Sequence, residues 1–357
     1  MFRGNNVGKP TFPTTSRPEL SLDSGLKAPV SSQRTNEISQ VEKAGLPPLF
    51  LIMAKLITIA LSSLLLVLTA ANVHPQQSAD PQFKPVVENP AYTKNFPRVL
   101  FDEGHNNAET VNGRYKPFAD LLFSDGYHIV SNRKPFTKES LNTFKVLIIV
   151  NPLGAEDIDD EGADGPAFTS AECDAVANWV NGGGSVLLIV DPGHFAMAAE
   201  VLASKLEVEL NKGHITDPVN SDKTSNDTSA LIYSRENKLL LAHPITNGRT
   251  EAERLNVVMT FMGQSLKSRT GTEAFLKLAD TAVDNVGSPA KSSSAAGHAQ
   301  GIAYRLGKGR VVVLGDAAML SAQITGSDKR PFGMNTPDVD NRQLGLNIMH
   351  WLSGLLK

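Results

Sequence analysis

The sequence predicts an α/β fold in which helices cover both faces of a mainly parallel β-sheet. From residue 97 onward, short apolar segments alternate with amphipathic ones in a β-α-β-α-β-α-β order. The apolar segments are hydrophobic throughout instead of alternating with polar residues, which is typical of strands buried on both faces. Together the two patterns predict parallel strands joined by right-handed helical connections.

The expected elements follow one another with short connections. In chain order they are a strand at 98–101, a helix at 115–127, a strand at 128–130, a helix at 137–144 that Thr137 can cap, a strand at 145–150, a helix at 168–181 and a strand at 185–190. Leu121 and Leu122 share one face of the first helix. Thr169 and Glu172 have capping-box spacing, and Gly182 is expected just after the end of that helix.

The second half of the chain has a less regular pattern. Its expected elements are a helix at 200–210, a segment at 250–266 that is half helix and half strand, a flexible loop at 285–298, and a closing helix at 340–356 capped by Asp340 and Asn341. Two apolar runs flank Gly307, Lys308 and Gly309, which predicts a hairpin.

Composition excludes several classes of protein. The chain has 357 residues, 41% of them hydrophobic, so it is long enough to bury a sizeable core. The net charge is −3 and no long basic run occurs, so we expect no nucleic-acid partner. The single cysteine, Cys173, excludes an intrachain disulfide and a cysteine-rich zinc site.

The N-terminal region has the anatomy of an export signal. Residues 1–52 are expected to be disordered or absent from the mature protein. Residues 53–71 contain Lys55, an apolar stretch and small residues suited to cleavage, which predicts a signal peptide. The alternative is an uncleaved membrane anchor at 56–71. Both predict an extracytoplasmic (periplasmic or secreted) domain at 97–357, after a linker at 72–96.

Several segments, taken in order, resemble the class I glutamine amidotransferase-like domains. They are "VLFDEGHNN", "LIIVNP", "FTSAECDAVANWVNGGGSVLLIVD", "AHPITNGR", "GKGRVVVLGDAAML" and "DNRQLGLNIMHWL". The resemblance spans about residues 97–355. More specifically, the sequence resembles the branch of these domains that lacks amidotransferase activity. That branch is found in exported bacterial proteins, gliding-motility transporter accessory proteins and an intraflagellar transport protein. The resemblance implies a flavodoxin-like three-layer sandwich.

The nucleophile of active amidotransferases has no counterpart in this sequence. Those enzymes carry a cysteine in a strained G-x-C-x-G turn after a strand, and the corresponding segment here is "SVLLIVDPGHF". Cys173 lies instead in the preceding helix, where we expect it to be a small, half-buried structural residue. We therefore expect that the protein is not a glutaminase.

Polar residues follow the expected strands and predict a shared crevice. The carboxyl ends of parallel strands meet at one edge of a sheet, where ligands bind in this class of fold. The candidate ligand-binding residues at that edge are Asp102, Glu103, His105, Asn106, Asn107, Asn151, Asp191, His194 and Asp316.

Three hypotheses concern this crevice. A metal site on Asp102, Glu103 and His105 is disfavoured, because adjacent side chains diverge in an extended segment and no HExxH spacing occurs. In an acid–base site, His105 or His194 would be the base, with Glu103 as a further catalytic candidate. No G-x-S-x-G turn supplies a nucleophile. In the third hypothesis the polar residues close loops or bind a ligand.

The favoured interpretation is an exported, non-catalytic module that binds a small molecule, a glycan or an envelope protein at this crevice. The alternative is a hydrolase, with or without a metal, that uses Asp102, Glu103 and His105 on one loop and Asp191 and His194 on another. We expect no cofactor and no resident metal. Contact with a membrane is expected only through an uncleaved N-terminal segment.

Overall fold

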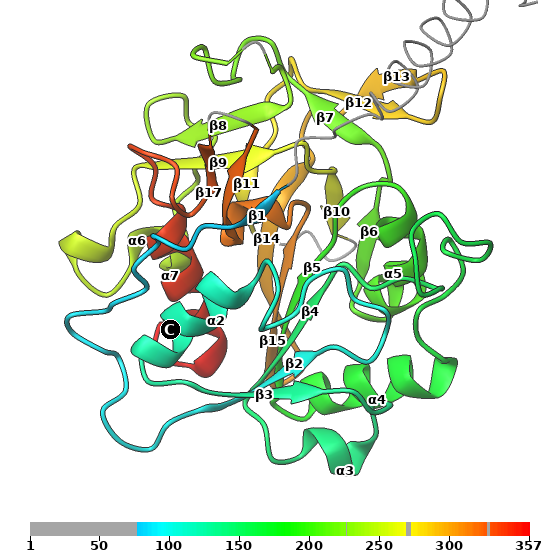
Figure 1. The fold of residues 1–357 in the computed structure, drawn as a ribbon, viewed down its shortest axis with the longest axis vertical. Coiled ribbons are helices and arrows are strands. Elements are labelled where there is room, and N and C mark those ends of the chain that lie inside the picture. Colours follow the sequence, from blue (N-terminus) through cyan, green and yellow to red (C-terminus); the bar gives the residue numbers. More distant parts are fainter. Residues whose placement is uncertain (1–76, 226, 269–272, 327–328) are drawn as a thin grey trace, which may run out of the picture. The chain divides into compact units, whose positions relative to one another are not determined.

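Nine strands form the central sheet of the protein (Figure 1). The computed structural model describes residues 77–225, 227–268, 273–326 and 329–357. The expected segments 1–52 and 53–71 lie outside the described residues, as does the start of the linker. Within the described ranges, no helix is both long and apolar enough to cross a bilayer.

The strands of the central sheet lie in the order β3-β2-β4-β5-β15-β14-β10-β6, and β11 also pairs with β14. Their bounds are β2 Arg98–Asp102, β3 His128–Asn132, β4 Val146–Val150, β5 Ser185–Ile189, β6 Val208–Leu210, β10 Leu266–Ser268, β11 Glu273–Lys277, β14 Ala299–Leu306 and β15 Gly309–Leu314. The five strands from β3 to β15 are parallel, and every pairing beyond β15 is antiparallel.

The sheet is therefore mixed, and the expectation of a mainly parallel sheet is confirmed only for one half. The physical reason lies in the connections. β14 and β15 are joined by the predicted hairpin at Gly307 and Lys308, which returns the chain antiparallel to itself. A turn of that length has no room for the crossover helix that a parallel pair needs.

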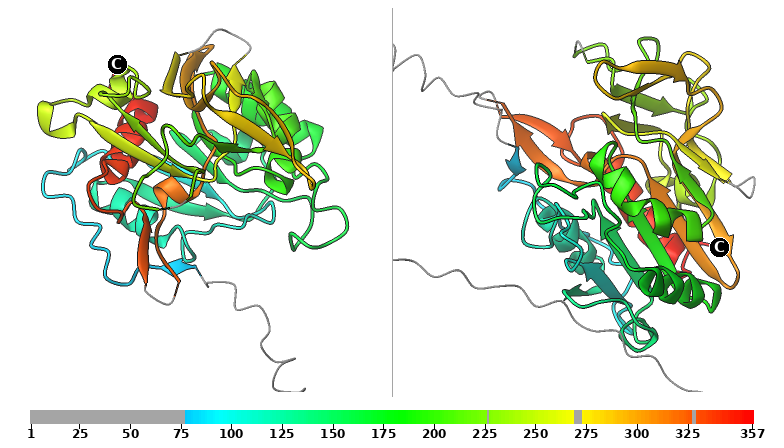
Figure 2. Two further views of the ribbon diagram at one scale, coloured as in Figure 1. Left: turned by 90° about the horizontal axis from the view of Figure 1, so that it is seen from above. Right: turned by 90° about the vertical axis from the view of Figure 1, so that its right-hand side faces the viewer.

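Helices cover both faces of the parallel half, which gives three layers (Figure 2). α2 (Lys116–Ser124) and α7 (Asn341–Ser353) bury apolar side chains against one face. α3 (Lys138–Leu141), α4 (Ser170–Asn181) and α5 (His194–Lys205) pack against the other. The α/β arrangement is consistent with a flavodoxin-like fold in this half of the molecule.

Local signals in the sequence explain where these helices begin and end. Thr137 and Thr169 each form a capping box with the residue three positions later. Gly182 has a right-handed φ of −77°, whereas Gly183 has a φ of 120°. The left-handed position therefore falls one residue later than expected. Asp340 precedes α7 but makes no side-chain cap; its carboxylate accepts the Val257 N–H instead (3.0 Å).

The remaining elements form smaller sheets and short turns. They are β1 (Ser78–Ala79), β16 (Ala322–Thr325) and β17 (Arg330–Gly333) in one sheet; β7 (His214–Thr216), β12 (Val283–Val286) and β13 (Lys291–Ser294) in a second; β8 (Ala230–Ser234) and β9 (Val257–Phe261) in a third; and α6 (Pro244–Asn247), η1 (Glu251–Glu253) and η2 (Ala318–Leu320).

Three expectations for the second half need correction. The loop expected at 285–298 contains most of the β12–β13 hairpin. The helix expected at 200–210 begins earlier, at His194, and ends at Lys205. The last three residues of the expected segment, Val208–Leu210, form β6 instead. The ambiguous segment 250–266 has only one 3-10 turn and is otherwise strand and loop. Short strands of this kind carry too few alternating positions for their pattern to be recognised.

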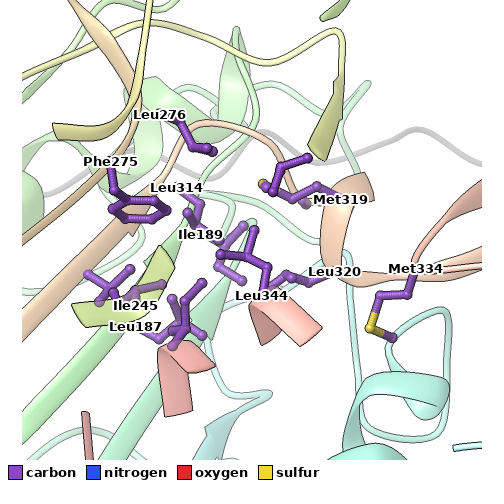
Figure 3. Packing of buried hydrophobic residues seen from close by; sticks show 14 of the residues in the cluster. Leu187, Ile189, Ile245, Phe275, Leu276, Leu314, Met319, Leu320, Met334 and Leu344 are labelled. Carbon is purple, nitrogen blue, oxygen red and sulfur yellow. The ribbon is translucent and has the colours of Figure 1, made fainter. Parts of the chain in front are cut away.

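A continuous apolar core joins the sheet to α7 (Figure 3). Leu187 and Ile189 of β5 and Leu314 of β15 lie against Leu344 of α7, with Leu320 of η2 nearby. All five are fully buried. Each contributes roughly 1.5–3 kcal/mol through burial, which holds the ends of β5 and β15 in fixed positions.

The order of the strands places a topological switch between β2 and β4. The chain passes from β2 through α2 to β3 on one side, and from β4 through α4 to β5 on the other. Loops that leave such a switch point diverge, and ligands bind between them. The loops after β2 and β4 are therefore where a site is expected.

Candidate functional site

The loop after β2 is built around a buried histidine. His105 donates from Nδ1 to both carboxylate oxygens of Asp102 (2.9 Å each) and from Nε2 to Glu172 Oε1 (2.9 Å). Its ring packs against both Phe136 and Phe168, with centroid distances of 4.7 and 4.4 Å. We call Asp102, His105 and Glu172 the His105 clamp.

The clamp favours the charged form of the His105 imidazole. Burial by itself lowers the pKa of His105, but the hydrogen bonds and charges of Asp102 and Glu172 outweigh burial and raise it. Burial likewise opposes ionisation of Glu172, yet its bonds from His105, Thr169 and the Phe136 N–H lower its pKa to about 2. The three groups thus form a fully hydrogen-bonded unit in which two carboxylates flank one imidazole ring.

The other candidate residues of this loop close the loop itself. Asn107 accepts the His105 N–H (3.1 Å) and donates to Asp102 and to the Val150 carbonyl. Glu103 accepts the Val111 N–H (3.0 Å) and pairs with Arg133. Asn106 is exposed and occupies the left-handed region with a φ of 49°, which Asn tolerates better than most residues.

These contacts limit what His105 can do chemically. An imidazolium that donates from both ring nitrogens has no lone pair to accept a proton, so it cannot act as a general base in this state. His105 is 7% exposed, which leaves little of the ring accessible to a substrate. Its hydrogen bonds join the loop after β2 to Glu172 in the first turn of α4, which is a structural role.

A second group of polar side chains gathers at the ends of β4, β5 and β15. The Asn151 amide donates to Asp191 (2.7 Å) and accepts the Asp191 N–H (2.8 Å). Asp191 also accepts the Ala317 N–H (2.7 Å). Asp316 is fully buried and accepts the Ala318 N–H (2.9 Å) and the Phe261 N–H of β9. The structure therefore brings together the predicted residues Asn151, Asp191 and Asp316.

Two residues that the sequence pattern did not indicate complete this group. Glu109 is 5% exposed, and its Oε1 pairs with Arg114 at 2.8 Å. Its other oxygen, Oε2, is buried without a hydrogen-bond partner among the described residues. Arg114 remains 37% exposed, so the group reaches the surface through its guanidinium. We call Glu109, Arg114, Asn151, Asp191 and Asp316 the strand-end cluster.

Electrostatics in the strand-end cluster favour protonated carboxyl groups. Burial, with a smaller contribution from the charge of Asp191, raises the pKa of Glu109 to about 7, against the opposing effects of Arg114 and Asn151. Burial also raises the pKa of Asp191. The pKa of Asp316 lies well above its ordinary value because of burial and the nearby Asp191. The charge of Arg114 acts on Glu109 and Asp191, whereas Asp316 lies beside Asp191.

His194 and Cys173 lie apart from both groups. His194 is the first residue of α5, is 46% exposed and pairs with Asp164. It has no hydrogen bond to the partners of His105, so the structure does not join the two imidazoles in one site. Cys173 is fully buried in α4, and burial raises the pKa of its thiol to about 11, which disfavours the thiolate.

The donor sets of the site do not resemble a metal centre. Within the described residues, no group of three or more His, Cys, Asp or Glu side chains is arranged to hold an ion. Asp102 and Glu103 point to different partners, as expected for neighbours in an extended segment.

Comparison with known proteins supports the fold only. No protein-family model and no curated protein matches the sequence. The mmIFT52 N-terminal domain is similar in structure, with a TM-score of 0.53 and 17% identity over 72% of this chain and 97% of that one.

Two further solved structures are weaker matches. A putative ThuA-like protein from Bacteroides uniformis has a TM-score of 0.36 and 11% identity over 74% of this chain and 93% of that one. A putative GMP synthase protein from Thermoplasma acidophilum has a TM-score of 0.36 and 11% identity over 73% of this chain and 96% of that one. Scores at this level carry no conclusion about activity.

Proposed function

We propose that this protein is an exported, non-catalytic module with a class I glutamine amidotransferase-like, flavodoxin-like fold that binds a ligand at the strand-end cluster. The ligand is a small molecule or glycan whose hydroxyl or amino groups donate hydrogen bonds to the buried carboxyl groups. The observation that carries the proposal is Glu109 Oε2, a buried acceptor without a partner among the described residues.

An unpartnered buried acceptor is costly. Leaving such a group unsatisfied costs roughly 1–3 kcal/mol, which a donor from a ligand recovers on binding. Arg114 and the partly buried Asp191 lie beside Glu109, so a ligand that enters along Arg114 meets charged and polar groups that neighbouring contacts already hold in place.

The same geometry argues against the hydrolase alternative. A hydrolase on these loops needs a base, and His105 has both ring nitrogens committed to carboxylates. His194 is 46% exposed and pairs with Asp164 instead of with a residue of the strand-end cluster. A carbohydrate or polyol ligand needs only the acceptors and donors that the cluster already presents.

Thermal unfolding of the full chain against a panel of monosaccharides, polyols and small amines tests the proposal. We expect members of the panel to raise the melting temperature of the wild type but not of Glu109→Met, which has similar length and no acceptor. The matched control is Glu161→Met, at an exposed position in the loop after β4. Equal stabilisation of all three proteins, or of none, would overturn the proposal. Turnover of a panel compound that is lost in Glu109→Met would show that the module is an enzyme.

Export is tested separately. Mass spectrometry of the mature N-terminus should show cleavage close to residue 71. An intact segment at 53–71 in membrane fractions would support the anchor, and an intact segment in soluble cytoplasmic protein would contradict export altogether.

A further inference from the structure

A cavity lies on the α2 and α7 face of the sheet, and none of the strand-end cluster residues line it. Its volume is about 730 Å³, inside the range of roughly 300–1,000 Å³ that is typical of small-molecule sites. The walls come from residues 86–90, Asp125 at the end of α2, residues 249–253 and the face of α7 that carries Arg342 and His350. We call it the α7 cavity.

The charges that line the α7 cavity are paired, with one exception among the cations. Arg249 bonds to Glu253, and His350 bonds through Nε2 to Asp125 (2.7 Å). Arg342 donates to the backbone carbonyl of Val86 but has no ion pair among the described residues. Its guanidinium is therefore a partly buried cation with donors left uncommitted.

His350 supplies a second unsatisfied polar atom in the same wall. Its side chain is 1% exposed and lines the cavity, and Nδ1 has no hydrogen-bond partner in the described part of the chain. A buried ring nitrogen of this kind is satisfied when a ligand or a bound water supplies the missing partner.

The rest of the lining combines apolar and neutral polar side chains, and the other titratable groups are acids. Val87, Ala252 and Leu346 line the cavity, which gives it an apolar surface next to the guanidinium. Glu88 also lines the cavity, together with the paired acids Asp125 and Glu253. Asp125 and Glu253 are already paired, and Glu88 is exposed to water, which screens its charge. The half-buried guanidinium of Arg342 therefore matches one negative charge better than a dianion such as phosphate.

We propose that the α7 cavity binds a small carboxylic acid with an apolar tail. The carboxylate pairs with the guanidinium of Arg342, whose planar fork matches it, and the tail packs against Val87, Ala252 and Leu346.

Titration calorimetry on the full chain tests this proposal with hexanoate as the probe. Hexanol has the same tail without the charge, and inorganic phosphate has charge without the tail. We expect hexanoate to bind the wild type and Arg342→Gln to weaken that binding by about tenfold or more, because a charge-assisted hydrogen bond is lost. The matched control, Arg254→Gln, removes a nearby arginine that does not line the cavity and should leave the affinity unchanged.

The conservative variant Arg342→Lys keeps the charge but loses the fork, so we expect an affinity between those of wild type and Arg342→Gln. If Arg342→Gln fails to fold, the hexanoate affinity of Arg342→Lys is compared with that of the wild type instead. The proposal is overturned if hexanol binds as tightly as hexanoate, if phosphate binds more tightly, if no binding occurs at millimolar hexanoate, or if both Arg342 variants bind like the wild type. None of these outcomes bears on Glu109.

Discussion

The His105 clamp and the strand-end cluster occupy adjoining loops, but their charges are organised in opposite ways. In the clamp, one imidazolium lies between two carboxylates and both ring nitrogens have partners. In the strand-end cluster, Arg114 pairs with Glu109, whereas Asp191 and Asp316 form no ion pair among the described residues, where Glu109 Oε2 also has no partner. The dense polar sequence after β2 is thus satisfied by contacts within the fold, whereas the less conspicuous group beside it contains a buried acceptor that no described residue satisfies.

The clamp should show the largest effect on stability. We expect His105→Ala to lower the free energy of unfolding by about 3–5 kcal/mol, because it leaves Asp102 and Glu172 buried without their cation. The measurement is urea unfolding at pH 6. A loss below about 1 kcal/mol would show that the clamp does not stabilise the fold.

The sign of the pH dependence follows from the two pKa shifts. The contribution of His105, whose pKa is raised, is complete below its ordinary value of 6.5 and is lost as the pH rises through the folded-state value. The contribution of Glu172 is present above its ordinary value of 4.5 and is lost as the pH falls toward about 2. The destabilisation in His105→Ala should therefore be greatest between these ordinary values and smaller at alkaline pH.

The strand-end cluster should respond in the opposite direction. The pKa of Glu109 is raised from 4.5 to about 7, so its burial lowers stability as the pH rises through that interval. We expect Glu109→Gln to raise the free energy of unfolding by up to about 3 kcal/mol at pH 8 and by little at pH 4. Urea unfolding at both pH values checks this, with Glu161→Gln as the exposed control. An equal change in the free energy of unfolding at both pH values would show that burial does not raise the pKa of Glu109.

The two capping boxes provide a smaller comparison. Thr169 caps α4 and also bonds to Glu172, whereas Thr137 caps the short α3 at an exposed site. We expect Thr169→Ala to destabilise the protein by about 2 kcal/mol and Thr137→Ala by about 0.5 kcal/mol, as measured by chemical denaturation. Equal losses would mean that the Thr169 hydroxyl does not support the clamp.

The smallest effect is expected at the surface histidine. His194 and Asp164 are 46% and 53% exposed, so their pair is screened by water and salt. His194→Ala should change the unfolding free energy by less than about 0.5 kcal/mol at low and high salt. A loss comparable to that of His105→Ala would mean that the two histidines act together.

Local patterns in the sequence predicted the parallel half of the sheet because its strands are continuous apolar runs between capped helices. They also placed Asn151, Asp191 and Asp316 at one edge, since that inference needs only the strand ends. Beyond the predicted β14–β15 hairpin, the antiparallel half escaped prediction because β6 and β10 have three residues each.

Long-range contacts explain what was missed in the site. Glu172 was recognised as a capping-box residue, but its bond to His105 joins positions 67 residues apart and leaves no local pattern. Glu109 and Arg114 lie in an irregular loop without periodicity. The available signal was a charged pair in the loop that leaves the first strand, where a parallel sheet of this order has its switch point.

The place of β15 in the sheet also determines when the fold can be completed. Residues 185–189 of β5 pair with residues 310–314 of β15, and β15 in turn pairs with β14. During synthesis, β5 therefore keeps an open edge until residue 314 has emerged from the ribosome. Contacts between such distant segments slow folding, and unpaired edges invite association with other chains. The parallel half must remain incomplete, and in need of protection from aggregation, for most of the time that the chain takes to be made.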